Sequence, residues 1–386
     1  MKNFKALFST LAICAGFGLV SPSIATAAWQ PAEKPAEKPA AESEKKSDGE
    51  KSPVDGKDGK KDEKKDKQLT GRATRVAFLN FGLPQSAQGK ADDMVGREVN
   101  SYAWKRVIPK LVAAKADVVV VRINSGGGLV SEMEPFQEMF QNDYKPRFRT
   151  VAWIENAISC AAMSPWSLEE MYFMPEGRIG GCTAFNGGSM QQVPPAMLEG
   201  LLAQMERVSR WANRDSKIMR SMQILEPLSA TTDENGNTKF FQDSSGKIIV
   251  NPPGEILTLS AVQALQIGFS KGTASTPEEL MKVMGINEYE FVAKDVSEFM
   301  DRNITESDRM HKRFTESRSK YQLALGAAEQ FQGDNERQDI AIGRARQALR
   351  TMQDTQRTSP NILMFNNVNV EWFAEQERIL KALQRR

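Results

Sequence analysis

A serine and a run of three glycines are the residues of this chain whose types and spacing favour chemistry. Ser159 follows an apolar, strand-like stretch at residues 151–154 and has small residues around it. Residues 126–128 are all glycine and follow, after residues 122–125, a second apolar stretch at residues 118–121. Glycines after a strand let backbone N–H groups approach a ligand closely. Such amides beside an exposed hydroxyl are two of the three parts of an acyl-transfer site.

The third part, a base that takes the proton of the hydroxyl, is harder to identify. The only histidine, His311, lies in a charged segment far along the chain from Ser159. A carboxylate whose pKa is raised by burial can act as a general base, and Glu155 stands just ahead of the serine. Arg178 is a further residue that could line the same cleft. Cys160 is an alternative nucleophile, but one step along a helix turns its side chain by about 100° from that of Ser159.

Both motifs also have an interpretation without chemistry. The three glycines can form a tight turn and nothing more, and Ser159 can serve as the N-cap of a helix. The two cysteines outside the N-terminal segment, Cys160 and Cys182, are interpreted as small buried residues. A disulfide between them stays open as an alternative, because sequence does not show whether their Cα atoms are close enough.

The elements that position these residues alternate between strand and helix. Short apolar runs predict strands, and apolar residues at steps of three and four predict helices. We expect strands at 76–79, 117–123, 150–154 and 170–174, helices at 93–114, 132–141, 159–168 and 194–222, a hairpin at 232–249, and two helices within 257–284 that begin after Ser260 and Thr276. This order predicts an α/β fold with a parallel sheet covered by helices.

Composition divides the chain into four parts. Residues 1–27 have the pattern of a signal peptide that is cleaved before Ala28, with a retained anchor as the alternative. Residues 28–71 consist mostly of Pro, Ala, Glu, Lys, Asp and Gly and are expected to be a disordered linker. Residues 72–293 have the composition of a folded domain. Residues 294–386 are expected to be a helical appendage with apolar stripes, one of them running from Ile340 to Met352, for oligomerisation or docking.

Several classes of function find no support. A formal net charge of +2 gives no general case for nucleic acid as a partner. One histidine and scattered cysteines predict no metal site, and the glycine run lacks the following Lys-Ser/Thr of a phosphate-binding loop. We therefore expect no cofactor. The lysine-rich linker is either a solvated tether or a segment that associates with an anionic membrane surface.

Five segments in order resemble the ClpP/crotonase superfamily, and within it the serine peptidases of the NfeD and SppA (signal peptide peptidase) type. They are residues 118–130 with the glycine run, 151–163 with Ser159, 171–180 ending in a glycine turn, 197–216 in a predicted helix, and 256–268 before a closing strand. The resemblance covers about residues 74–290. It implies a ClpP/crotonase-like fold, with Ser159 as the nucleophile and the amides of Gly127 and Gly128 as the oxyanion hole.

The resemblance also implies a lysine base. No lysine occurs between Lys145 and Lys217, and Lys217 stands at about the SppA-type distance from Ser159. The position of the NfeD-type base is occupied by Glu199, and Cys160-Ala161 replaces the Ala-Gly that follows the family's nucleophile. Lys217 also has the neighbours of a residue on a solvated face.

The function implied is an exported, periplasmic or extracellular serine endopeptidase that cleaves extended apolar peptides, as a homo-oligomer. The alternative is a catalytically inactive relative that acts as an oligomeric scaffold or peptide-binding protein. A third hypothesis, crotonase-type acyl-CoA chemistry, fits poorly with export. Peptides or proteins are the expected partners in the first two cases.

Overall fold

The structure is a computed structural model that describes residues 72–84, 92–185, 191–358, 362–366 and 368–384. The predicted signal peptide 1–27 and the linker 28–71 lie outside the described residues. All structural statements below concern the described segments.

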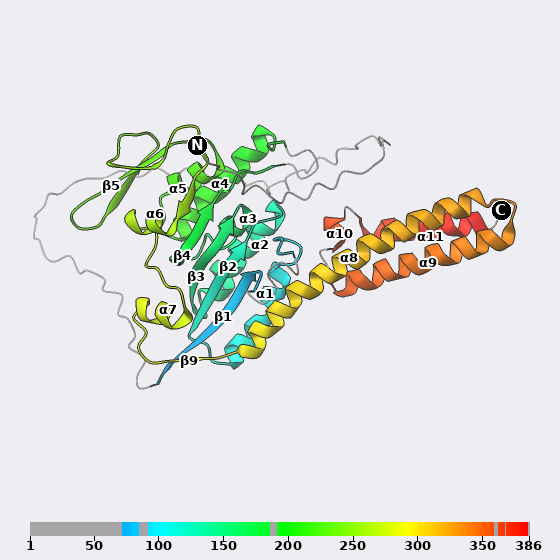
Figure 1. The fold of residues 1–386 in the computed structure, drawn as a ribbon, viewed down its shortest axis with the longest axis horizontal. Helices are drawn as coiled ribbons and strands as arrows, with labels where there is room; N and C mark the ends of the chain where they lie inside the picture. The colour runs from blue at the N-terminus through cyan, green and yellow to red at the C-terminus, as the bar shows by residue number, and fades with distance from the viewer. Residues whose placement is uncertain (1–71, 85–91, 186–190, 359–361, 367, 385–386) are drawn as a thin grey trace, which may run out of the picture. The chain divides into compact units, whose positions relative to one another are not determined.

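A six-stranded sheet, mostly parallel, forms the centre of the fold (Figure 1). Its strand order is β8-β4-β3-β2-β1-β9, and only β8 runs antiparallel to its neighbour. The strands are β1 (Thr74–Gly82), β2 (Val118–Ser125), β3 (Arg149–Ile158), β4 (Glu170–Gly180), β8 (Thr258–Ser260) and β9 (Tyr289–Phe291). A second sheet of three strands contains β5 (Leu228–Thr232), β6 (Thr238–Phe241) and β7 (Ile248–Asn251).

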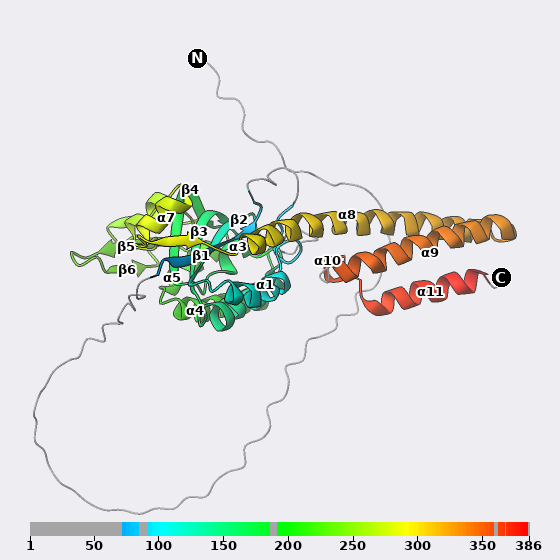
Figure 2. The ribbon, with the colours of Figure 1, turned by 90° about the horizontal axis from the view of Figure 1, so that it is seen from below.

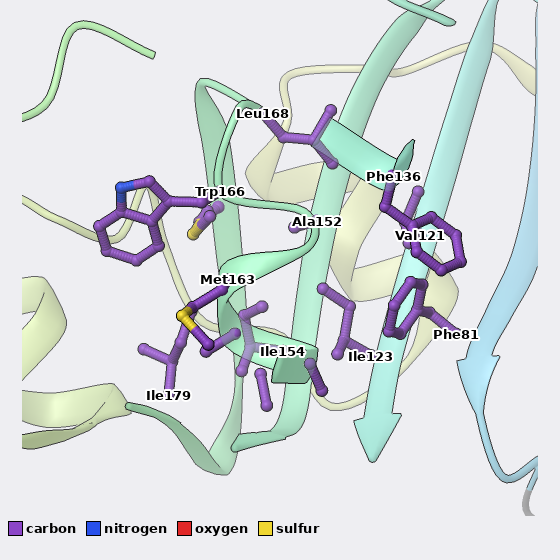
Figure 3. Packing of buried hydrophobic residues seen from close by; sticks show 14 of the residues in the cluster. Phe81, Val121, Ile123, Phe136, Ala152, Ile154, Met163, Trp166, Leu168 and Ile179 are labelled. Atoms are coloured by element: carbon purple, nitrogen blue, oxygen red, sulfur yellow. The ribbon is translucent and has the colours of Figure 1, made fainter. Parts of the chain in front are cut away.

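The two faces of the central sheet are buried by different partners. On one face, Val121 and Ile123 of β2 and Ile154 of β3 pack with Phe81 and Phe136 (Figure 3). Parts of α1 (Ser101–Ala113), α2 (Met133–Met139) and α4 (Pro195–Trp211) belong to this core. The opposite face is covered by α7 (Pro277–Val283). Because apolar side chains on both faces are buried, the strands are apolar almost without interruption.

The register of β1, β2 and β3 brings the ends of these strands to one edge. Val118 of β2 pairs with Val76 of β1 and with Arg149 of β3. An irregularity follows, since Ile123 pairs with Ile154 but Asn124 pairs with Asn156, so that Glu155 is the extra residue of a bulge. The glycine run after β2 and Ser159 after β3 therefore leave the sheet at the same edge.

The predicted helix 93–114 is wrong in its first part. The helix α1 begins at Ser101, where the side chain of Asn100 accepts a hydrogen bond from Ala103 N–H. Residues 92–100 instead form a loop, which we call the 92–100 loop, and Val95 pairs with Gly128 in an isolated β-bridge. Val95 and Val99 have the helical spacing and both are buried, but Val95 is bridged to Gly128 of the glycine run and Val99 to Val95.

Other boundaries also differ from the sequence-based predictions. The strands β3 and β4 extend to Ile158 and Gly180, while α3 (Cys160–Met163) is one turn long and ends before Pro165. The predicted helix 194–222 is divided into α4 and α5 (Ser216–Gln223), because Asn213 adopts a left-handed conformation with φ 50°. The predicted caps are confirmed: Ser260 caps α6 (Ala261–Gln266) and Thr276 caps α7.

Four helices end the chain, namely α8 (Lys294–Gln330), α9 (Asn335–Thr358), α10 (Ile362–Phe365) and α11 (Val370–Gln384). The first turns of α8 belong to the main core through Val296, Met300 and Ile304. From Met310 onward α8 shares a separate core with the later helices, and α8, α9 and α11 run side by side (Figure 2). The prediction of an α/β fold with a helix-covered parallel sheet and a helical C-terminal region is confirmed.

Candidate active site

Ser159 occupies a sharp corner between β3 and α3. Its backbone has φ 57° and ψ −128°, a conformation that costs a residue with a side chain about 1–3 kcal/mol. The corner is held by the backbone: Ser159 N–H donates to Gly180 O at 2.9 Å, and Ser159 O accepts from Ala162 N–H at 2.9 Å. The side chain makes no capping hydrogen bond to α3. The interpretation of Ser159 as a side-chain N-cap is therefore wrong.

Gly127 lies directly against this corner. A Cβ atom built on Gly127 would be 2.7 Å from Ser159 Cβ and 2.7 Å from the carbonyl oxygen of Ile158. Gly127 also has φ +104°, which side chains rarely allow. Glycine is thus required here for both space and backbone conformation. The fold therefore places Ser159 against Gly127, one of the two glycines that the resemblance assigns to the oxyanion hole.

The glycine run is anchored by the 92–100 loop. Val95 N–H donates to Gly127 O at 2.9 Å, and Leu129 N–H donates to Val95 O at 2.8 Å. A Cβ on Gly128 would lie 2.2 Å from Val95 O, so the bridge requires glycine at this position as well. Burial raises the pKa of the Asp93 carboxyl, although hydrogen bonds from Gly126 N–H and the Ser125 hydroxyl oppose that rise.

The two predicted oxyanion donors differ in their hydrogen bonding. Gly127 N–H donates to the hydroxyl of Ser125 at 3.2 Å, and that hydroxyl donates to Asp93 O at 2.9 Å. For Gly128 N–H, the described segments contain no hydrogen-bond acceptor. An oxyanion would find the Gly128 amide unoccupied, whereas the Gly127 amide would have to exchange partners.

The side chain of Lys217 binds Asp215 and not Ser159. It lies in the first turn of α5, and its Nζ donates to both carboxylate oxygens of Asp215, at 3.3 and 3.2 Å. The side chain is 39% exposed. Within the described residues no hydrogen bond or ion pair joins Lys217 to Ser159. An ammonium group has no lone pair for a proton, so Lys217 would have to release Asp215 and also lose a proton before acting as a base.

Glu155 is engaged by an ion pair with Arg122. Arg122 also donates to Asn80 Oδ1 at 3.1 Å, and Asn80 donates to Asp301 of α8 at 2.8 Å. Glu155 is the bulged residue of β3, so its side chain does not follow the alternation of the strand. It forms its ion pair with Arg122 of the neighbouring strand β2. Glu155 therefore belongs to a polar row across β1, β2 and β3.

The thiols do not fit the role of a nucleophile. Cys160 is buried, and its Sγ contacts Leu129 O at 3.0 Å. Burial raises the pKa of Cys160 to about 12 and also raises that of Cys182, so both remain protonated near neutral pH. Both cysteines are free, in agreement with their interpretation as small buried residues.

The remaining candidate residues are either exposed or packed within the C-terminal helices. Glu199 near the start of α4 and Arg178 of β4 are exposed. His311 lies within α8, where its ring packs on Phe365, and burial lowers its pKa to about 4. In the part of the chain that the structure describes, no group of His, Cys, Asp and Glu side chains could hold a metal ion.

Sequence reasoning missed Asp93 and Ser125, the residues that hold the glycine run in place. Ser125 is 1% exposed although it lies at the end of a strand. The signal in the sequence was its position directly before three glycines. Asp93 was overlooked because the apolar period that follows it suggested a helix.

No family model matches the chain. The chain is 28% identical to the membrane protein NfeD1b of Bacillus subtilis (strain 168) over 174 residues, which is 45% of this chain. The match covers 35% of NfeD1b, so the chain spans about a third of the length of this curated relative.

Two solved structures are distant neighbours. A mutant of the 1510-N membrane-bound stomatin-specific protease, in complex with a substrate peptide, covers 60% of this chain and all of that chain, with a TM-score of 0.40 and 16% identity. ClpP1 from Listeria monocytogenes covers 53% of this chain and 94% of that chain, with a TM-score of 0.32 and 12% identity. No helix in the described segments is both long enough and apolar enough to cross a membrane. Over 45% of its length the chain is similar to an NfeD-type protein, which confirms the resemblance that the sequence motifs indicated.

Proposed function

We propose that this chain is a serine endopeptidase that cleaves extended, apolar peptides, with Ser159 as the nucleophile. The observation that carries the proposal is the strained corner of Ser159, whose side chain lies against Gly127 and does not cap α3. Strained residues cluster at functional sites, where the surrounding fold maintains them. A serine that only ended a strand would not need this conformation.

The backbone amides of the glycine run supply the oxyanion hole in this proposal. Ser159 Oγ attacks the peptide carbonyl carbon, the C–N bond then breaks, and the amine leaves with the proton that the hydroxyl lost. Water then cleaves the ester between Oγ and the acyl group, which releases the carboxylic acid and restores the hydroxyl. The Gly128 N–H, and the Gly127 N–H once it releases Ser125, donate to the developing oxyanion. An extended peptide next to the ends of β2 and β3 would bind by strand addition.

The base in this mechanism is Lys217 or Glu155, each freed from its ion pair when peptide binds. A specific observation favours the second candidate function, an inactive peptide-binding protein: Lys217 is paired with Asp215 and Glu155 with Arg122. In that case the same corner and glycine run bind peptide without cleaving it.

Hydrolysis of casein and of an apolar fluorogenic peptide separates the two functions. For a peptidase, we expect turnover by the unmodified chain and none by Ser159→Ala. Lys217→Ala and Glu155→Gln then identify the base, because loss of the base lowers kcat by about 100-fold or more. Equal turnover with and without the serine hydroxyl, or none in either protein, contradicts the peptidase proposal. In the second outcome, peptide binding measured by fluorescence anisotropy tests the peptide-binding alternative.

We further propose that the chain is exported to the periplasm or the extracellular space, with cleavage before Ala28, and assembles as a homo-oligomer that associates with a membrane surface. N-terminal sequencing of the secreted protein tests the cleavage, and an uncleaved N-terminus in that fraction contradicts it. Light scattering coupled to gel filtration tests the oligomer. Sedimentation with anionic vesicles tests the surface association.

A further inference from the structure

The helices α8 and α9 form a groove of about 910 Å³ on the side that α11 leaves open. On the occupied side, Tyr321 of α8 donates to Gln376 of α11 at 2.8 Å and its ring packs against Trp372. Figure 2 shows the three helices side by side. We propose that the groove between α8 and α9 binds an acidic amphipathic helix of a partner protein.

The floor of the groove is apolar and exposed. Leu323 is 76% exposed and Ile340 is 50% exposed, although both lie on helices that have a buried core of their own. Ala324, Ala341 and Ala348 also line the groove. Ile340 belongs to the apolar stripe that the sequence predicts, but unlike Ala345, Leu349 and Met352 it is exposed in the groove. Exposed apolar side chains gathered in one concave patch indicate an interaction site, and alanines let a helix approach closely.

The rim of the groove is basic. Arg313, Lys320, Arg337 and Arg344 line it, with Glu316 as the acidic lining residue. Three other exposed cations of α8 pair with a carboxylate on the same helix: Arg302 with Glu298, Arg309 with Glu306 and Lys312 with Asp308.

Three of these rim cations, Arg313, Lys320 and Arg344, form no ion pair within the described parts of the chain. Unpaired cations around an apolar floor are complementary to acidic residues that flank an apolar stripe.

The dimensions of the groove fit a helix. Its lining positions run from Arg313 along α8 to Phe331, the residue that follows α8, and from Arg337 to Thr351 on α9, with the periodicity of one helix face. At 1.5 Å per residue the α8 stripe is about 27 Å long, which matches a helix of about 18 residues. With α11 on the other side, such a helix would complete a four-helix arrangement.

The charge of the rim argues against a second copy of this chain as the occupant. A two-fold contact between two such grooves would place the same surface against itself. The cations of one rim would then face the cations of the other, which is unfavourable. The occupant that matches the groove is therefore a helix of opposite charge.

A synthetic helix tests the proposal with the full chain. The probe is a fluorescent peptide of about 18 residues with Leu and Ala along one face and Glu on both sides of that face. A second peptide carries Lys in place of each Glu. We expect the acidic peptide to bind, and we expect the basic peptide to bind at least about tenfold more weakly, by fluorescence anisotropy.

Variants locate the binding site. Arg344→Glu and Leu323→Glu should each raise the Kd of the acidic peptide by about tenfold or more. Both residues are exposed, and circular dichroism checks that each variant is folded. Arg350→Glu is the matched control, because Arg350 is an exposed cation of α9 that does not line the groove. It should leave the Kd unchanged.

Each of the following results would overturn the proposal. The acidic peptide does not bind, or the two peptides bind equally, or Arg344→Glu and Arg350→Glu bind the acidic peptide alike. A self-association that Arg344→Glu abolishes, measured by sedimentation velocity, would show that a second copy occupies the groove and would also overturn it.

Discussion

The hydroxyl of Ser125 accepts a hydrogen bond from Gly127 N–H at 3.2 Å and donates one to Asp93 O at 2.9 Å. This buried hydroxyl thus connects the glycine run to the 92–100 loop. It also occupies one of the two amides that the proposed mechanism assigns to the oxyanion hole. Gly127 itself lies against Ser159.

Ser125→Ala is expected to destabilise the fold. The substitution leaves a buried N–H and a partly buried carbonyl without their partner, which costs about 1–3 kcal/mol of unfolding free energy. Urea denaturation followed by circular dichroism measures the change. Ser319→Ala on the exposed face of α8 is the control and should change the unfolding free energy by less than about 0.5 kcal/mol. Equal effects of the two substitutions would contradict the structural role of Ser125.

Gly127→Ala is expected to distort the corner that holds Ser159. The new Cβ would be 2.7 Å from both Ser159 Cβ and Ile158 O, and the backbone has φ +104°. We expect a loss of at least about 1–3 kcal/mol of unfolding free energy. The same substitution at Gly326, a helical position with open space around it, should stabilise by about 0.5–1 kcal/mol. An unchanged unfolding free energy for Gly127→Ala would mean that Gly127 does not lie this close to Ser159 in solution.

Cys160 and Cys182 are expected to resist alkylation in the folded protein. Both are buried, and burial raises the pKa of Cys160 to about 12, so very little thiolate is present at pH 8. Iodoacetamide treatment followed by mass spectrometry should show no label on Cys160 or Cys182 in the native protein and a label on both after denaturation and reduction. Rapid labelling of Cys160 in the native state would refute its burial and reopen it as a nucleophile.

Glu98 is expected to make stability depend on pH. The side chain is fully buried and accepts hydrogen bonds from Met94 N–H and Arg97. Burial raises the pKa of Glu98 from 4.5 to about 7. The folded state therefore holds this proton more tightly than the unfolded state, and unfolding free energy falls as pH rises from 4.5 to about 7. The loss is at most about 3 kcal/mol.

Urea unfolding at pH 5 and pH 8 measures this dependence. Glu98→Gln should have a smaller difference between the two conditions than the unmodified chain, because its amide does not titrate. Glu234→Gln, at an exposed turn residue, should leave the difference unchanged. If Glu98→Gln retains the full pH dependence, another group is responsible for it.

The central strands could be predicted from local pattern, because each consists of consecutive apolar residues bounded by turn residues. The N-caps Ser260 and Thr276 were predictable for the same reason, since a cap depends on residues within one turn of it. The 92–100 loop was not predictable in this way. Val95 and Val99 have the helical spacing, and what overrides it is a β-bridge from Val95 to Gly128, which lies 33 residues along the chain.

The candidate site was predictable only in part. That Ser159 and the glycine run meet followed from two strands of a parallel sheet that end at one edge, and that arrangement is general for such sheets. The partners of the candidate bases were not predictable. Glu155 meets Arg122 because a bulge in β3 re-aims its side chain, and no periodicity in the sequence marks that bulge.

The sequence by itself determined the α/β alternation, the glycine run beside the serine and the amphipathic C-terminal helices, because hydrophobic period and turn preference are local properties of the chain. Tertiary structure alone decided that Ser125 occupies the Gly127 amide, that Arg122 holds Glu155, and that Ile340 faces an open groove. These contacts depend on which segments, distant in the chain, the packed core brings together and how each side chain is then oriented.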